Sequence, residues 1–192
     1  MMRLIHPEQV IETERLRLEP LQPDHAAGLF ALLQDPQIYR YIPQEPPVAQ
    51  SLLAQRYSQL ARRLSPAGDE AWLNWALSLT ATGEYIGQVE ATVFEDQTAY
   101  LAYLVGAEFW GHGYATEACT RVIRLLFDDY RVTQIKAEVD TRNTTSMRLL
   151  ERLGFVRIGY QANADFFKNS SSDEYTYGLS AAEHMKGRPD GA

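Results

Sequence analysis

Hydrophobic and polar residues alternate in several segments of the chain, which is the pattern of strands with one buried face. Three such segments follow one another at WLNWALSLT, YIGQVEATVF and TAYLAYLVG, which begin at Trp72, Tyr85 and Thr98. The turns between them are short and polar, so an antiparallel meander is predicted here. Further strands are predicted at TERLRLEPL, QIKAEVD, FVRIGYQ, FFKN and DEYTYGLS.

A second period, close to 3.6 residues, predicts four helices. They cover residues 23–34, 51–64, 115–130 and 143–154. Asp24 is expected to cap the first helix, and Gly154 to close the fourth. Residues 38–47, between the first two helices, form a loop rich in aromatic residues and proline. This loop either walls a binding site or only connects two helices.

The order of these elements is β, α, α, three strands, α, β, α and two strands. This order predicts an α+β fold with one central, mostly antiparallel sheet flanked by about four helices. The length of 192 residues suits a single domain. We expect that domain over residues 11–182, with an N-terminal extension at 1–10 and a disordered tail at 183–192.

The formal net charge of −7 disfavours nucleic acid and suits a cationic or amine partner. The single cysteine, Cys119, cannot form an internal disulfide, and packing is its expected role. Neither a secretory signal nor a membrane span is found, so a cytoplasmic protein is expected. No metal site is expected, because four histidines lie scattered at assumed surface positions, namely His6, His25, His112 and His184.

The stretch FWGHGYATEA, from Phe109 to Ala118, lies between a predicted strand and a predicted helix. The first N–H groups of a helix lack intrahelical acceptors and lie at the positive end of its dipole, which suits a phosphate group. Gly111 and Gly113 would let the backbone approach an anion without an intervening Cβ. A plain turn is the alternative, because the stretch is neither a P-loop nor a dinucleotide fingerprint.

A second strand-to-helix junction carries NTTSMRLLERLGF from Asn143. In one interpretation, Asn143 or Thr144 caps the helix. In the other, Asn143 and Ser146 hold a ligand. Local sequence leaves both open.

Four motifs, TERLRLEPL, WGHGYATEA, NTTSMRLLERLGF and DEYTYGL, occur in the order and at about the separations of the GCN5-related N-acetyltransferases (GNAT). The chain resembles in particular their RimJ/RimL branch, over Ile11 to Leu179. This resemblance implies the three-layer α/β/α fold of that family with a splayed strand pair. It also implies acetyl-CoA as the donor and a primary amine as the acceptor, either a protein N-terminus, as on ribosomal proteins, or a small amine. Relatives often pair through their C-terminal strands, so a homodimer is compatible with the resemblance.

By the same resemblance, the cofactor pyrophosphate would rest on backbone amides of the loop and the helix start. These residues are Gly111, His112, Gly113, Tyr114, Ala115 and Thr116. The pantetheine arm would run beside the preceding strand near Leu104 and Val105. Asn143 would orient that arm or a nearby loop, and Ser146 would lie near the thioester sulfur.

Two catalytic residues of many family members are absent. Leu150 stands where they carry a tyrosine that protonates the thiolate, and Tyr100 where they carry a glutamate. The RimL-like pattern implies Ser146 as the acid and Asp165 as the base, while Glu90 is a competing base. The two losses leave one alternative to an enzyme, a module that binds CoA or acetyl-CoA with little turnover.

Overall fold

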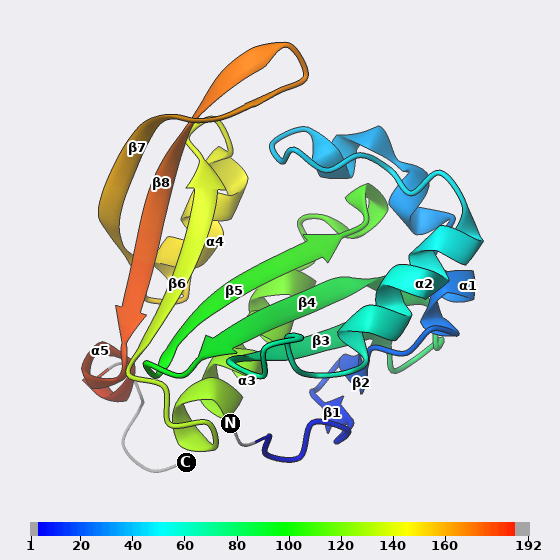
Figure 1. Cartoon of the computed structure of the whole chain (residues 1–192), viewed down its shortest axis with the longest axis horizontal. Coiled ribbons are helices and arrows are strands. Elements are labelled where there is room, and N and C mark those ends of the chain that lie inside the picture. The colour runs from blue at the N-terminus through cyan, green and yellow to red at the C-terminus, as the bar shows by residue number, and fades with distance from the viewer. Residues whose placement is uncertain (1–3, 187–192) are drawn as a thin grey trace.

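The computed structural model describes residues 4–186. The fold is built around one mixed sheet of eight strands (Figure 1). The strands lie in the order β1-β2-β3-β4-β5-β6-β8-β7. Their bounds are β1 Ile11–Glu12, β2 Leu16–Pro20, β3 Glu70–Leu79, β4 Tyr85–Phe94, β5 Thr98–Val105, β6 Gln134–Asp140, β7 Val156–Phe167 and β8 Ser170–Ser180. The predicted α+β class is confirmed.

Within the same residues, five α-helices and three short 3-10 helices accompany the sheet. The α-helices are α1 His25–Leu29, α2 Gln50–Leu60, α3 Tyr114–Asp128, α4 Thr144–Arg152 and α5 Ala181–Lys186. The 3-10 helices are η1 Leu32–Gln34, η2 Pro36–Tyr39 and η3 Ala107–Phe109. The tail expected at 183–192 belongs to α5 as far as Lys186, and its remainder lies outside the described residues.

The order of the strands confirms the predicted meander. β3, β4 and β5 pair antiparallel in chain order. α3 then crosses to β6, which runs parallel to β5 and pairs with it at three positions, the last being Tyr100 with Lys136. Beyond that pair the two strands diverge, as Figure 1 shows. The splay leaves residues 101–105 of β5 without strand pairing on the side of β6, and we call this divergence of the two strands the gap.

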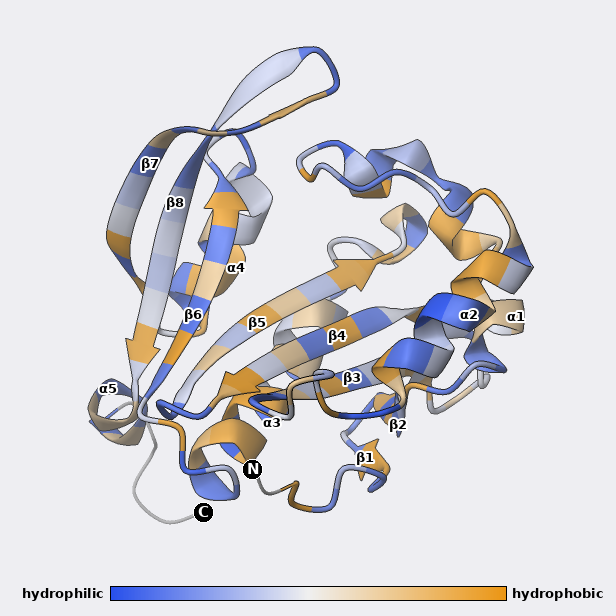
Figure 2. Cartoon of the chain, in the orientation of Figure 1, coloured by the Kyte–Doolittle hydropathy of each residue, from blue (hydrophilic) through white to orange (hydrophobic). Residues whose placement is uncertain are grey.

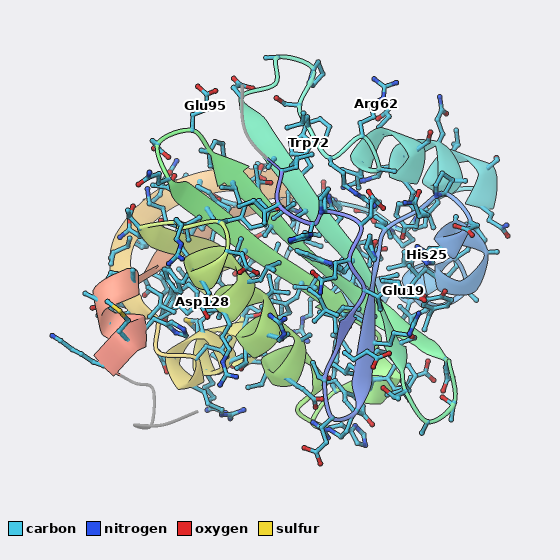
Figure 3. The ribbon with its side chains drawn as sticks, turned by 90° about the horizontal axis from the view of Figure 1, so that it is seen from below. Glu19, His25, Arg62, Trp72, Glu95 and Asp128 are labelled. Carbon is cyan, nitrogen blue, oxygen red and sulfur yellow. The ribbon has the colours of Figure 1, made fainter. Side chains whose placement is uncertain are left out.

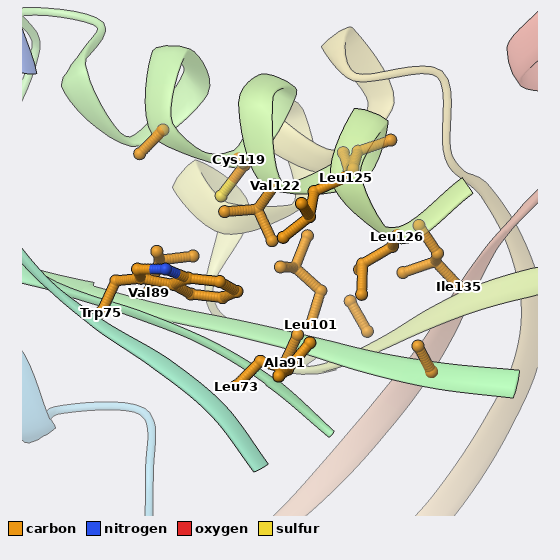
Figure 4. Packing of buried hydrophobic residues seen from close by; sticks show 14 of the residues in the cluster. Leu73, Trp75, Val89, Ala91, Leu101, Cys119, Val122, Leu125, Leu126 and Ile135 are labelled. Carbon is orange, nitrogen blue, oxygen red and sulfur yellow. The ribbon is translucent and has the colours of Figure 1, made fainter. Parts of the chain in front are cut away.

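The main core lies between the sheet and α3. α3 buries the face that its periodicity predicts, and this face packs on apolar side chains of β3, β4 and β5 (Figure 4). The packed residues include Cys119, Val122 and Leu126 of the helix and Trp75, Val89 and Leu101 of the strands. Each such aliphatic side chain contributes about 1.5–3 kcal/mol by leaving water. The burial of Cys119 confirms its packing role.

α1 and α2 cover the opposite face of the sheet. Leu53 and Tyr57 of α2 pack with Ala76 of β3, while the preceding Trp75 faces α3. Side chains alternate between the two faces of a strand, so each strand supplies both layers. Figure 2 shows this alternation as interleaved hydrophilic and hydrophobic positions along β4 and β6. The result is a sheet with helices on both faces.

The first helix is shorter than predicted. α1 ends at Leu29, and η1 and η2 replace a continuous helix to residue 34. Gly28 weakens the helix, and a Cβ at this position would lie 2.3 Å from the Tyr85 ring, so no better helix former fits. Asp24 makes no side-chain cap; instead, Asp35 accepts a 2.9 Å hydrogen bond from the Gln37 N–H and caps η2.

The two strands predicted at FVRIGYQ and FFKN are one long strand, β7. Its pairing with β8 shifts between Arg157 and Gly159 and again between Gln161 and Asp165. These bulges interrupt the alternation from which a strand is recognised in sequence. The strand predicted at DEYTYGLS, from Asp173, begins earlier than expected, because β8 starts at Ser170.

Candidate active site

The glycine stretch forms the entry to α3. Gly111 and Gly113 have φ angles of 80° and 82°, in the left-handed region that glycine adopts at little cost. The Glu117 N–H donates to the Gly113 carbonyl at 3.0 Å, and the N–H groups before it in the first turn have no intrahelical acceptor. A Cβ at Gly111 would have no heavy atom within 4 Å, so the space beside this glycine is open. These features fit a pyrophosphate.

Arg15, just before β2, braces this loop. Its Nη1 donates to the His112 carbonyl at 2.9 Å, its Nε donates to Glu117 at 2.7 Å, and its guanidinium lies 4.7 Å from the centroid of the Tyr114 ring. Thr13 donates to the same Glu117 carboxylate at 2.6 Å. Sequence reasoning missed this contact, although its residues lie in two of the motifs that carry the resemblance.

Arg15 and Thr13 also determine the ionisation state of Glu117 in the first turn of α3. Burial alone would raise the pKa of Glu117, but the hydrogen bonds from Thr13 and Arg15 outweigh it and hold that pKa below its usual range. Glu117 therefore stays ionised and paired at neutral pH, and Arg15 offsets a negative charge that would repel a bound phosphate. The His112 ring is exposed and stacks on Tyr114 with centroids 5.7 Å apart.

The free edge of β5 faces the gap beside this loop. The Gly106 N–H donates to the Ile86 carbonyl of β4 at 2.9 Å. Because backbone groups alternate in direction along a strand, the Val105 N–H points the other way, into the gap. The Val105 carbonyl accepts a 2.7 Å hydrogen bond from the Trp110 indole, and the Leu104 carbonyl faces β4. Pairing of a pantetheine arm with Leu104 and Val105 stays a prediction, in which Val105 supplies the groups that face the gap.

Ser146 is held from two sides. Asn143 caps α4, since its Oδ1 accepts the Ser146 N–H at 3.1 Å. The Tyr103 hydroxyl of β5 donates to Ser146 Oγ at 3.1 Å. Burial raises the pKa of Tyr103 above its usual range, and the bond to Ser146 offsets only part of that effect. A phenol thus reaches Ser146 from β5, whereas position 150 provides only a buried Leu150.

Asp140 anchors the turn that carries these residues. Its carboxylate accepts hydrogen bonds from the backbone and guanidinium of Arg142 and, at 2.6 Å, from Ser172 of β8. Burial alone would raise the pKa of Asp140, but these bonds outweigh it and lower that pKa. These hydrogen bonds therefore hold the junction between β6 and α4 against the hairpin formed by β7 and β8.

Glu90 lies on β4, on the face covered by α2. It pairs with Asn74 of β3 and Ala102 of β5, and its side chain is partly buried. Burial raises the pKa of Glu90, and the Arg56 guanidinium of α2 offsets only part of this effect. A carboxylate in this state is a better proton acceptor at neutral pH than a solvated one.

Asp165 is exposed on β7, and its Oδ1 accepts the N–H of its neighbour Phe166 at 2.7 Å. The tip of the hairpin contacts the loop at residues 38–47, because Lys168 Nζ donates to the Ile42 carbonyl at 2.8 Å and lies 3.2 Å from the Glu45 carboxylate. The Lys168 side chain therefore links the β7–β8 hairpin to the aromatic loop, and both lie above the diverging ends of β5 and β6 in the view of Figure 1. Asp165 and Glu90 lie on different elements in different surroundings.

His25 contradicts the expectation of four surface histidines. It is 9% exposed, its Nδ1 accepts the Gln22 N–H at 2.9 Å, and its Nε2 lies 3.5 Å from Glu19 (Figure 3). The ring also packs edge-on against Tyr85. Such a contact is tertiary, so the sequence around a short helix does not reveal it.

Among residues 4–186, no three His, Cys, Asp or Glu side chains lie together as a metal ion would require. No helix in that part of the chain is long and apolar enough to cross a membrane.

A family model spans most of these elements. The model of the acetyltransferase (GNAT) domain matches residues 15–156, from the brace at Arg15 through the glycine loop to the start of β7. The chain belongs to the GNAT acetyltransferase family. The resemblance that its motifs carry is thus confirmed, and the protein is an N-acetyltransferase of the GNAT kind.

Relatives of this acetyltransferase agree with that assignment. An N-acetyltransferase called p20 from Bacillus licheniformis is 26% identical over 178 residues, which cover 92% of this chain and 98% of the relative. The solved spermidine N-acetyltransferase of Vibrio cholerae, in complex with CoA and spermine, has a TM-score of 0.75 at 19% identity and covers 90% of this chain and 99% of its own. The ribosomal-protein-S5-alanine acetyltransferase of Vibrio fischeri has a TM-score of 0.76 at 19% identity, with coverages of 94% and 100%. These two structures establish the shared fold.

Proposed function

We propose that this acetyltransferase moves an acetyl group from acetyl-CoA to a primary amine in a single ternary complex. The open glycine loop at the start of α3 supports this donor, because unpaired backbone N–H groups and a helix dipole suit its pyrophosphate. Acetyl-CoA is the co-substrate typical of the family, and it supplies an activated acetyl thioester. In this proposal, the amides of residues 111–116 hold the pyrophosphate, and Val105 and Asn143 position the pantetheine arm.

Glu90 serves as the base in this proposal. An amine acceptor is mostly protonated at neutral pH and must lose protons to attack the carbonyl carbon. Glu90 has the burial and the raised pKa that a base at neutral pH needs, and it lies one strand from the gap. Asp165, exposed on the hairpin, is the alternative.

Ser146 serves as the acid in this proposal. As the new C–N bond forms and the C–S bond breaks, Ser146 gives its proton to the departing thiolate and takes one from Tyr103. The amine loses its protons to Glu90 and from there to solvent, and Tyr103 regains a proton from solvent before the next cycle. The 3.1 Å hydrogen bond between the two hydroxyl groups is the observation that carries this proposal, because it supplies a proton path in place of the tyrosine missing at position 150.

The acceptor of the acetyl group has two candidate classes. The similar structures include a spermidine N-acetyltransferase and a ribosomal-protein-S5-alanine acetyltransferase, so a small amine and a protein N-terminus are both candidates. A reducing, cytoplasmic compartment suits the single buried Cys119.

Two measurements test the proposal. Acetyl-CoA and CoA should each raise the melting temperature, and acetyl-CoA should release thiol when a primary amine is added. No stabilisation by either nucleotide would refute the glycine-loop site. Stabilisation without thiol release from any amine would instead indicate a binding module.

A further inference from the structure

Two buried polar atoms beside Glu90 lack hydrogen-bond partners among residues 4–186. They are the hydroxyl of Tyr57, which is 1% exposed, and Oε1 of Gln88, which is 5% exposed. Gln88 precedes Glu90 by two residues on β4, so both side chains lie on the α2 face of the sheet. Tyr57 comes from α2 above them and acts electrostatically on Glu90.

An unsatisfied buried polar group costs free energy, so native proteins retain few of them without a reason. All three groups here can accept hydrogen bonds, and one of them is a carboxylate. A primary amine or ammonium group has only donors in its protonated form, and it would satisfy Glu90, Gln88 and Tyr57 together. This corner of the face is therefore suited to a cationic nitrogen.

More carboxylates continue across the same face of the sheet. Ala102 of β5 pairs with Glu90. Tyr100, two residues before Ala102 and so on the same face, shares a side-chain hydrogen bond with Glu138 of β6. Glu174 of β8 lies diagonal to Glu138 on the neighbouring strand. Burial raises the pKa of Glu174, and its negative neighbours, Glu138 first, raise it further. Ala102, between the two groups of carboxylates, is exposed, so the face between them is open.

Glu90, Glu138 and Glu174 form a band of carboxylates along the face of the sheet that α2 covers. β4 and β8 are three strand spacings apart, which is about 14 Å in a regular sheet and more where β5 and β6 diverge. Two cations, Arg56 near Glu90 and Lys136 over Tyr100, lie at the same face and offset part of the charge. No three of the acidic side chains described come together as a metal ion would need. The band suits an extended cation better than a compact one.

We propose that the acceptor is a linear diamine or polyamine. One amine binds at Glu90, Gln88 and Tyr57, next to the gap where acetyl transfer occurs. The remaining positive charge lies along the face toward Glu138 and Glu174, with Asp165 at its far end. This proposal rests on the proposed function, since it names the acceptor of that same site.

The test compares three amines that differ mainly in the number and reach of their charges: butylamine, 1,4-diaminobutane and spermidine. In thiol-release assays, kcat/KM for spermidine should exceed that for butylamine about tenfold or more, because the second charge interacts with a carboxylate in a partly screened site. In Glu138→Gln/Glu174→Gln, this ratio should fall about tenfold toward unity. Glu84→Gln, which alters an exposed carboxylate in the turn between β3 and β4, is the matched control and should keep the ratio. Equal values for the three amines, or a ratio that the double variant does not change, would overturn the proposal.

The variant Tyr57→Phe provides an independent test of the amine site. The hydroxyl has no partner among the described residues, so its removal should leave the melting temperature unchanged or raise it, while KM for spermidine rises several-fold. A lower melting temperature with an unchanged KM would show that the hydroxyl has a structural role and would count against the amine site.

Calorimetric titration of spermidine into the protein saturated with CoA separates this proposal from the proposed function. Binding that weakens in Glu138→Gln/Glu174→Gln, without turnover of any amine, would support the amine site and refute the acetyltransferase proposal. Turnover of an alanine-initiated peptide with no binding of spermidine would refute the amine site and leave the acetyltransferase proposal standing.

Discussion

At the scale of single residues, the proposed mechanism gives the hydrogen bond between Tyr103 and Ser146 the role of a tyrosine that position 150 lacks. Leu150 stands where the family resemblance implies a tyrosine, and a serine hydroxyl alone is a weak acid. Tyr103 comes from a strand 43 positions earlier in the chain, so no local motif links it to Ser146. The contact exists because β5 and α4 lie on adjacent parts of one core.

Tyr103→Phe and Ser146→Ala should each lower kcat about 100-fold, because each interrupts the transfer of a proton to the thiolate. KM for acetyl-CoA should change little, which steady-state kinetics would measure. Tyr160→Phe, which removes an exposed tyrosine hydroxyl on β7, is the control and should retain activity. A Tyr103→Phe variant with the same kcat as the parent would remove Tyr103 from the proton path.

If Glu90 is the base, as proposed, its ionisation links catalysis to stability. Its pKa is raised in the folded protein, so ionisation of Glu90 is less favourable in the folded than in the unfolded chain. Its protonated form supports the fold at low pH, and that contribution is lost as the pH rises through the folded-state pKa. At neutral pH, Glu90 therefore lowers the free energy of unfolding.

Glu90→Gln should consequently raise the melting temperature at pH 7 by about 3 °C while lowering kcat about 100-fold. The gain in stability should shrink as the pH falls through the raised folded-state pKa of Glu90, and it should vanish below the unfolded pKa of about 4.3, where Glu90 is protonated in both states. Calorimetry across that pH range would measure it. Asp165→Asn is the comparison: if that variant loses turnover and Glu90→Gln does not, the base is Asp165.

At the scale of elements, Arg15 links the start of β2 to the start of α3. Two of the motifs that carry the family resemblance are therefore in direct contact, which gives a physical reason for their joint presence. Arg15→Met should weaken acetyl-CoA binding about tenfold, because the loop loses its brace and Glu117 its counter-charge. Arg17→Met is the matched control, since Arg17 pairs with Glu12 and Glu19 away from the loop. Equal effects of the two substitutions on acetyl-CoA affinity would contradict this role.

The backbone of the same loop gives a second test. Gly113→Val should weaken acetyl-CoA binding by about tenfold or more, because valine is strained at a φ of 82° and its Cβ would lie 3.5 Å from Nη2 of Arg15, which braces the loop. Gly68→Val introduces comparable strain at a φ of 78° in a distant turn with open space around it. Titration calorimetry should find a loss of affinity only in the first variant. Unchanged affinity in Gly113→Val would refute the placement of the pyrophosphate.

At the scale of the whole molecule, regular periodicity was sufficient to predict the meander, α3 and the α+β class. It failed where tertiary contacts decide the local structure, as at α1, where Tyr85 excludes a larger side chain from position 28, and at β7, where bulges break the alternation. The glycine loop was predictable because its conformation, and the role proposed for it, depend on its backbone. The brace at Arg15, the Tyr103–Ser146 pair and the unpaired atoms beside Glu90 were not, because each joins side chains from elements far apart in the chain.

The most direct test of the account is the identity and amount of product formed from acetyl-CoA and an amine. The purified protein is incubated with acetyl-CoA and spermidine, and the released thiol and the acetylated amine are measured together, the second by mass spectrometry. The account predicts one acetylated amine for each CoA released, with both amounts falling in Glu90→Gln and Tyr103→Phe. Acetyl-CoA that stabilises the protein but yields no acetylated product from polyamines, simple amines, amino acids or peptide N-termini would contradict it.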